Sequence, residues 1–130
     1  MNDINKFKSK PGYRRIFAAF GYSMAGLKTA CQHEHAFRQE LVLLIVGVVV
    51  ALLLPPPVSM LQKLLLIGVL VLVLIVELMN SAIEAVVDRV SLDVHALSKN
   101  AKDFGSAAVL LTLLLAMATW GVIVLPLVCS

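Results

Sequence analysis

Three long apolar segments decide what this chain can fold into. They cover residues 36–54, 58–79 and 105–128. At about 1.5 Å rise per residue, each is long enough as a helix to cross a hydrocarbon layer about 30 Å thick. Hydrophobic residues make up 60% of the chain and charged residues 15%, which excludes an ordinary soluble domain and a disordered chain. The sequence therefore predicts an all-α membrane protein with three transmembrane helices.

A further helix is predicted ahead of the first span, over residues 13–33. Its apolar side chains fall within about 100° of arc, and basic residues lie outside that arc. The apolar set is Ile16, Phe17, Phe20, Met24, Leu27 and Cys31, and the basic set is Arg14, Arg15 and Lys28. This pattern is typical of an amphipathic helix on a membrane surface; a soluble helix packed on its own protein is the alternative. Residues 1–12 are polar and predict a mobile N-terminal tail, which leaves residues 13–130 as the membrane domain.

The distribution of the eleven basic residues predicts the orientation of the chain. Those that precede or open the first span are Lys6, Lys8, Lys10, Arg14, Arg15, Lys28 and Arg38, and those between the second and third spans are Arg89, Lys99 and Lys102. Because positive residues stay on the cytoplasmic side, the N-terminus and residues 80–104 are predicted to be cytoplasmic. This face would attract anionic lipids and anionic cytosolic ligands. No nucleic-acid partner is expected, because no soluble basic module is present.

A polar stripe follows the second apolar segment. Glu77, Asn80, Ser81, Glu84 and Asp88 share a face roughly 100° wide on a helix that is otherwise apolar. A carboxylate at the end of a membrane helix is costly unless it is paired, bound to a metal or facing water. The stripe is therefore predicted to form half of an active site.

Other polar groups are predicted to lie at the same depth. Glu77 is about 28 Å along the helix axis from Val58, which places it at the inner edge of the hydrocarbon. Glu34 comes just before the first span, and Lys102 and Asp103 come just before the third. Groups far apart in the sequence should thus meet at the cytoplasmic interface.

The residue types in this group favour one kind of chemistry. Carboxylates with few histidines suit a hard cation such as Mg²⁺. A partly desolvated carboxylate suits a general base, and neighbouring cations can neutralise a transferring phosphoryl group. The sequence therefore predicts metal-assisted chemistry between a cytosolic polyanion and a substrate dissolved in the membrane.

Simpler interpretations remain open for single residues. Glu77 could pair with a basic neighbour in a helix bundle, and Trp120 is expected in an aromatic belt at the outer membrane surface. Gly47 and Gly68 could each allow two helices to approach closely, although neither forms a G-x-x-x-G pair. A small transporter subunit that uses Glu77 as a relay is less favoured, because transporter sites lie near the bilayer midplane.

Four sequence motifs resemble those of the prokaryotic diacylglycerol kinase family, small integral membrane kinases unrelated to soluble lipid kinases. The motifs are ELMNSAIEAVVDR at residues 77–89, AKDFGSAAV at 101–109, AFRQE at 36–40 and GYS at 21–23. The resemblance implies three transmembrane helices and a surface helix, assembled as a homotrimer with sites between subunits in the bacterial inner membrane. It also implies transfer of the ATP γ-phosphate to diacylglycerol, which gives phosphatidic acid and ADP.

The same resemblance implies roles for individual residues. Glu77 would be the general base, and Glu34 and Glu84 would hold Mg²⁺ against the ATP phosphates, with Asn80 in support. Nucleotide contacts would come from Arg15, Tyr22, Glu34, Glu84, Asp93, Val94, His95, Lys102 and Asp103. The lipid substrate would contact Arg15, Ser23, Arg38, Glu77 and Ser106.

The chain departs from the best-known family pattern at three positions. Phe20 replaces an alanine and Met24 a tryptophan, which bears on the lipid pocket, and Val94 replaces a tyrosine beside the expected adenine contact. Related members phosphorylate undecaprenol instead of diacylglycerol. The motif at residues 77–89 favours the diacylglycerol branch, with undecaprenol as the alternative substrate.

Overall fold

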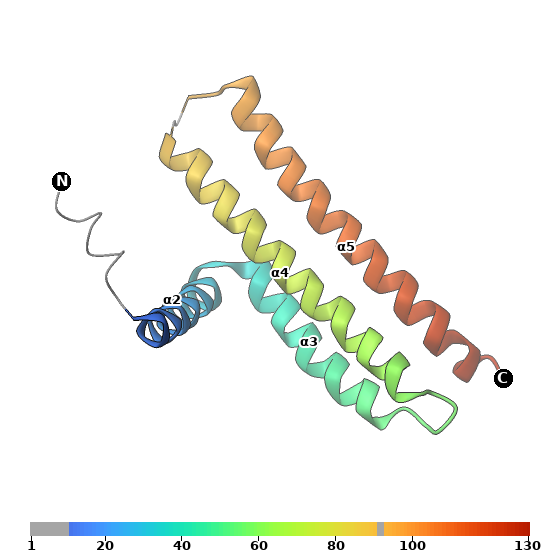
Figure 1. The fold of residues 1–130 in the computed structure, drawn as a ribbon. Helices are drawn as coiled ribbons and strands as arrows, with labels where there is room; N and C mark the ends of the chain where they lie inside the picture. Colours follow the sequence, from blue (N-terminus) through green and yellow to red (C-terminus); the bar gives the residue numbers. More distant parts are fainter. Residues whose placement is uncertain (1–10, 91–92) are drawn as a thin grey trace. The chain divides into compact units, whose positions relative to one another are not determined.

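The structure, a computed structural model, describes residues 11–90 and 93–130, and within them the chain forms four helices and no strand. These are α2 (Gly12–His33), α3 (His35–Leu53), α4 (Met60–Val90) and α5 (Ala96–Val128) (Figure 1). Among the described residues, α3, α4 and α5 are long and apolar enough to cross a membrane. The prediction of an all-α chain with three such helices is confirmed. Most of the predicted tail, residues 1–10, lies outside the described residues.

The chain divides into two compact units, residues 1–34 and residues 35–130. In the first unit, α2 begins after Pro11, whose carbonyl accepts from the backbone N–H groups of Arg14 and Arg15. It ends at Glu34, whose N–H bonds to the carbonyl of Ala30 at 2.9 Å. The apolar side chains of α2 are largely exposed, as in a helix that lies on a membrane surface.

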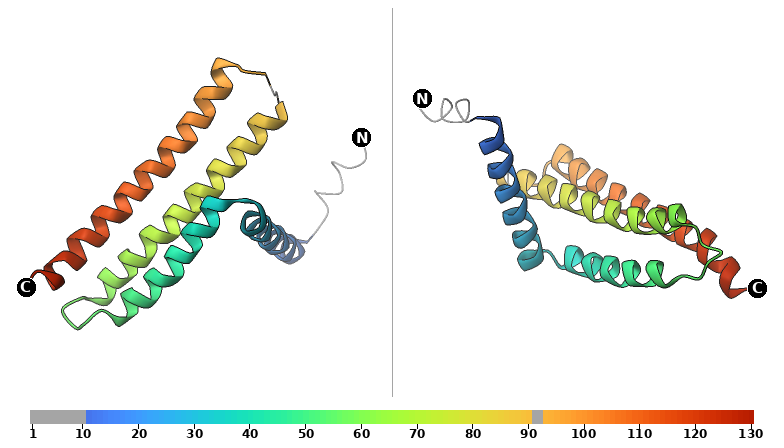
Figure 2. Two further views of the ribbon diagram at one scale, coloured as in Figure 1. Left: turned by 180° about the vertical axis from the view of Figure 1, so that it is seen from behind. Right: turned by 60° about the horizontal axis from the view of Figure 1, so that its bottom comes forward.

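In the second unit, α4 packs against both α3 and α5 (Figures 1 and 2). The turn from α3 to α4 contains three prolines, which cannot continue a helix. Ser59 and Gln62 then form a reciprocal capping pair at the start of α4. The Lys63 ammonium donates to the carbonyls of Leu52 and Leu54, at 3.3 and 3.0 Å, and so ties the end of α3 to the start of α4.

Helix α5 begins earlier than the sequence analysis predicted. The third apolar segment was predicted over residues 105–128, but the helix starts at Ala96. His95 caps it, because its Nδ1 accepts from the backbone N–H of Leu97 at 3.1 Å. Lys99 and Asp103, one turn apart, form an ion pair at 2.6 Å. The change from polar to apolar residues near residue 105 therefore does not coincide with the start of α5.

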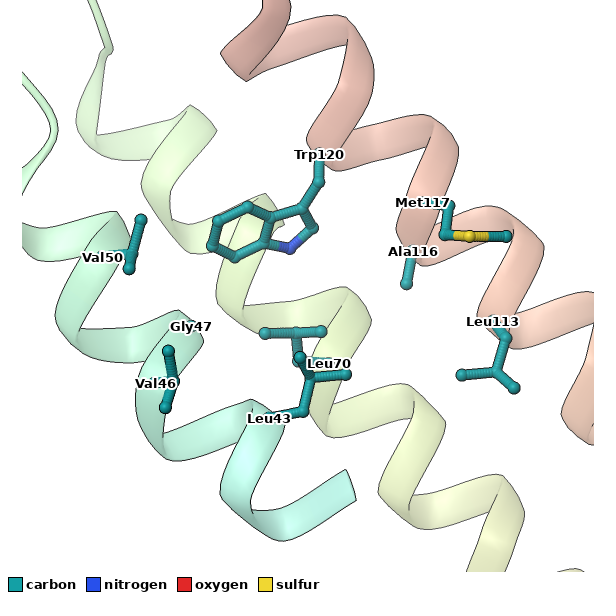
Figure 3. A pocket seen from close by; sticks show the side chains of 9 residues that line it. All are labelled: Leu43, Val46, Gly47, Val50, Leu70, Leu113, Ala116, Met117 and Trp120. Carbon is teal, nitrogen blue, oxygen red and sulfur yellow. The ribbon is translucent and has the colours of Figure 1, made fainter. Parts of the chain in front are cut away.

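The apolar core of the second unit lies between its three helices. Leu70, Val73 and Ala116 are buried there. The indole of Trp120 crosses from α5 toward α3, and its Nε1 donates to the carbonyl of Leu66 at 3.1 Å (Figure 3). The ring is half-buried against the core, and its expected place in an outer aromatic belt stays a prediction.

The absence of a side chain at Gly47 leaves room for the Trp120 ring. A Cβ at this position would overlap a methyl group of Leu70 and come within 3.3 Å of the Trp120 ring. An apolar cavity of about 240 Å³ adjoins these residues. The close approach of helices that Gly47 suggested is thus present, without a G-x-x-x-G pair.

Candidate active site

The polar stripe of α4 lies on the same helix face as the buried apolar residues of that helix, and this face is called the buried seam of α4. Leu66, Leu70 and Val73 are buried at spacings of a packed helix face, and Glu77 follows at the next position of that face. Glu77 is 6% exposed and is the buried charged residue among those described. Asn80 and Glu84 continue the seam toward the end of the helix. One face of α4 is thus apolar up to Val73 and polar from Glu77 onward.

The buried seam of α3 carries a carboxylate that the sequence analysis did not select. Phe37, Gly47 and Ala51 are buried on this face, and Glu40 lies on the same face by its spacing. The Oε2 atom of Glu40 is buried and has no hydrogen-bond partner among the described residues. The spacing of Glu40 from Phe37 and Gly47 could have identified it as a residue of the buried face. It was missed because the neighbouring Arg38 and Gln39 made it look like part of a polar helix start.

The register of α3 against α4 sets Glu40 opposite Glu77. Gly47 packs against Leu70 where these helices approach most closely. In an antiparallel pair, about two turns back from Gly47 lead to Glu40, and about two turns forward from Leu70 lead to Glu77. The two carboxyl groups are close enough to interact electrostatically, as this register requires.

Asn80 joins α4 to α5 at the next turn. A Cβ on Gly105 would overlap the Asn80 Oδ1 atom, so with Asn80 in this position α5 passes this close because residue 105 is glycine. The same oxygen is buried and has no hydrogen-bond partner within residues 11–90 and 93–130.

A polar cavity lies beyond this contact, between the end of α4 and the start of α5. Its volume is about 270 Å³, and it is lined by Val87, Asp88, Asp93, Val94, His95, Ser98, Lys99 and Lys102. Lys102 and Asp88 form an ion pair at 2.6 Å across the two helices, and the charge of Glu84 also acts on Lys102. Lys99 and Lys102 bring positive charge to this cavity, where a phosphate chain could accept from them, and in this structure each is paired with an aspartate.

The remaining predicted residues of the second unit lie around these features. Asp93, Val94 and His95 are exposed on the connector, and Ser106 is exposed on α5. Arg38 is half-buried at the start of α3, where its Nη2 donates to Nδ1 of His35 at 2.7 Å.

The first unit holds the other predicted residues, and they are described with that unit alone. Arg15, Tyr22 and Ser23 are exposed on α2, and Glu34 is half-buried at its end. The Ser23 hydroxyl donates to the carbonyl of Ala19 at 2.9 Å.

The donor set suits Mg²⁺ only in part. In the described ranges, no three His, Cys, Asp or Glu side chains come together as a metal cluster. Glu84 and Asp88 stand one turn apart on the same stripe of α4. Because Mg²⁺ is often bound through one or two carboxylates together with substrate phosphates, such a sparse set fits a metal that arrives with a nucleotide.

Comparison with known proteins identifies the family. The model of prokaryotic diacylglycerol kinases matches residues 21–124. The chain belongs to the prokaryotic diacylglycerol kinase family. A diacylglycerol kinase of Pseudomonas aeruginosa is 53% identical over 119 residues, 92% of this chain and 95% of the relative. Another from Escherichia coli K12 is 49% identical over 109 residues, 84% and 88% of the two chains. One from Helicobacter pylori is 39% identical over 121 residues, 93% of each chain.

Proposed function

We propose that this member of the family transfers the γ-phosphoryl group of ATP to the free hydroxyl of diacylglycerol at the cytoplasmic membrane interface. The kinase class and the lipid substrate follow from the family and from the names of its relatives. The observation that carries the chemistry is Glu77, a nearly buried carboxylate where the apolar seam of α4 becomes polar. A lipid hydroxyl reaching this level would meet a base shielded from bulk water.

The proposed reaction is an in-line phosphoryl transfer. The hydroxyl oxygen of the lipid forms a bond to the γ-phosphorus, and the bond from that phosphorus to the β–γ bridging oxygen breaks. ADP leaves with the electron pair, and the hydroxyl proton passes to the Glu77 carboxylate. Asn80, one turn away, orients groups beside this base, and Lys102 stabilises negative charge on the phosphates.

The nucleotide contacts are proposed as the family resemblance implies them. In this proposal the nucleotide contacts Arg15, Tyr22, Glu34, Glu84, Asp93, Val94, His95, Lys102 and Asp103. Glu34 and Glu84 would hold Mg²⁺, which when bound neutralises phosphate charge. The lipid side would be lined by Arg15, Ser23, Arg38, Glu77 and Ser106. The polar cavity beside Lys102 supports the nucleotide half of this assignment.

The proposed setting is the bacterial inner membrane, with the N-terminus in the cytoplasm. The positions of the basic residues support this orientation. The working form is proposed to be a homotrimer with sites completed between subunits, as the family resemblance implies. The sparse carboxylate set of the described residues supports a site that needs further ligands.

Diacylglycerol is favoured over undecaprenol as the acceptor. The Pseudomonas, Escherichia and Helicobacter relatives are all named diacylglycerol kinases. Transport is not favoured, since Glu40 lies near the start of α3 and Glu77 follows the apolar segment of α4 instead of lying at its centre.

The test is phosphate transfer by the purified protein in mixed micelles. With labelled MgATP, we expect labelled phosphatidic acid from diacylglycerol and much weaker labelling of undecaprenol. Glu77→Gln should lower kcat by about 10²-fold or more while nucleotide binding persists. Glu34→Gln and Glu84→Gln should each raise the Mg²⁺ concentration needed for half-maximal rate. No labelling of either lipid would reject kinase function, and a fully active Glu77→Gln would reject the assigned base.

A further inference from the structure

Glu40 and Glu77 bring two carboxyl groups together in the interior of the bundle. Glu77 is almost fully buried, and Glu40 is half-buried opposite it. Helix α4 is packed along α3, and Glu77 is the charged group that it presents to Glu40. On α3 itself, the nearby ionisable residues His35 and Arg38 are hydrogen-bonded to each other. Two ionised carboxylates in such a place repel strongly, and sharing one proton removes the repulsion.

The roles and surroundings of the two carboxyl groups determine which of them holds the shared proton. As the general base, Glu77 must be ionised when the lipid hydroxyl arrives. Glu40 has a buried Oε2 with no partner among the described residues. An ionised oxygen at this position would lack solvation. A protonated oxygen can instead donate a hydrogen bond, which the Glu77 carboxylate can accept.

We infer that Glu40 is a positioning residue, whose protonated carboxyl donates a hydrogen bond to Glu77 and holds that carboxylate toward the lipid hydroxyl. This inference rests on the proposed function, in which Glu77 is the general base. During transfer, the lipid O–H bond breaks and its proton goes to Glu77, while the proton of Glu40 stays in place. Glu40 thus makes no contact with the reacting atoms and acts only through Glu77.

Two substitutions separate a hydrogen-bond donor from a charge. Glu40→Gln keeps the size of the side chain and a donor without any charge, so kcat should stay within about threefold of the native value. Glu40→Leu removes the donor, so kcat should fall about ten- to a hundredfold with the KM for ATP unchanged. The unfolding temperature in detergent should fall for the leucine variant, because the buried Glu77 carboxylate loses its hydrogen-bond donor, and should stay near the native value for the glutamine variant. Val42→Leu, on the exposed face of α3, controls for a leucine at this level and should keep the native rate.

Infrared spectroscopy provides a readout that does not depend on turnover. At the pH of the assay, the difference spectrum of native protein and Glu40→Gln should show the loss of one protonated carboxyl C=O band. Loss of ionised carboxylate bands alone would overturn the inference, even if Glu40→Leu fails to fold. A leucine variant with the native kcat, or a glutamine variant as slow as the leucine variant, would also overturn it. If native protein labels no lipid, the proposed function fails, and the spectra still test the carboxyl pair.

Discussion

Asn80 and Gly105 depend on each other at the scale of single residues. Asn80 has a carbonyl oxygen that is buried without a partner among the described residues, and Gly105 is the neighbour whose missing side chain leaves room for it. Most glycines in helices reduce stability relative to alanine. Here the lack of a Cβ lets α5 approach the polar stripe of α4 and leaves room for the Asn80 side chain between the two helices.

Gly105→Ala should therefore impair catalysis. The new Cβ would overlap the Asn80 side chain and force it to move, which should lower kcat about tenfold and the free energy of unfolding by about 1–3 kcal/mol. Steady-state kinetics and unfolding in mixed micelles measure the two effects. Gly68→Ala is the matched control, because a Cβ there has no atom within 4 Å. Equal behaviour of the two variants would contradict the packing argument.

Lys102 is the second residue whose role is open to a direct test. Its ammonium pairs with Asp88 in the wall of the polar cavity. Lys102→Met keeps much of the side-chain length but removes the charge, so the KM for ATP should rise about fivefold or more, with the KM for diacylglycerol little changed. Lys63→Met, at the opposite end of α4, is the control for losing one positive charge. A higher KM for the lipid alone would place Lys102 outside the nucleotide site.

At the scale of helices, register is fixed by a small number of contacts inside the second unit. Gly47 admits Leu70 between α3 and α4. The Trp120 indole fixes α5 on α4 through the carbonyl of Leu66. Side-chain hydrogen bonds to backbone groups are directional, whereas apolar contacts alone would let helices slide. These contacts lie deep in the bundle, yet they determine which polar groups face one another at its end.

Trp120→Phe tests the directional contact. Phenylalanine retains most of the ring but cannot donate to Leu66, so the free energy of unfolding should fall by about 1 kcal/mol. Unfolding in mixed micelles by a denaturing detergent, followed by circular dichroism, measures this change. Trp120→Leu should be less stable again, since the ring that packs on Gly47 is lost. A phenylalanine variant as stable as the native protein would mean that the hydrogen bond contributes little.

At the scale of the whole molecule, the orientation in the membrane connects the site to its two substrates. A cytosolic nucleotide can reach Lys102 and Glu84 only if the connection between α4 and α5 faces the cytoplasm. The basic residues predict that arrangement. It also puts the two cysteines, Cys31 and Cys129, on opposite sides of the membrane.

The two cysteines allow a simple topology experiment. In Cys31→Ser, the remaining Cys129 should react with a membrane-impermeant maleimide added outside intact spheroplasts. In Cys129→Ser, Cys31 should react only after the membrane is permeabilised. Cys129 is exposed and Cys31 is half-buried, so labelling of denatured protein serves as the control for reactivity. The reverse labelling pattern would contradict the proposed orientation.

Much of the fold was predictable from local patterns. Apolar length gave the three spanning helices, and the proline run gave the turn between α3 and α4. The spacing of Glu77, Asn80 and Glu84 predicted their common face. The start of α5 at Ala96 was not recognised, because a polar helical segment and a polar connector have similar compositions.

The fold class and the polar stripe of α4 could be predicted from the sequence, because hydrophobic length and helical periodicity are properties of contiguous residues. The residues that oppose that stripe could be identified only from the packed helices. Glu40 faces Glu77 and Gly105 meets Asn80 because of the register between helices, which depends on side chains distant in sequence. The register is set by packing, because Gly47 leaves room for Leu70 and the Trp120 ring.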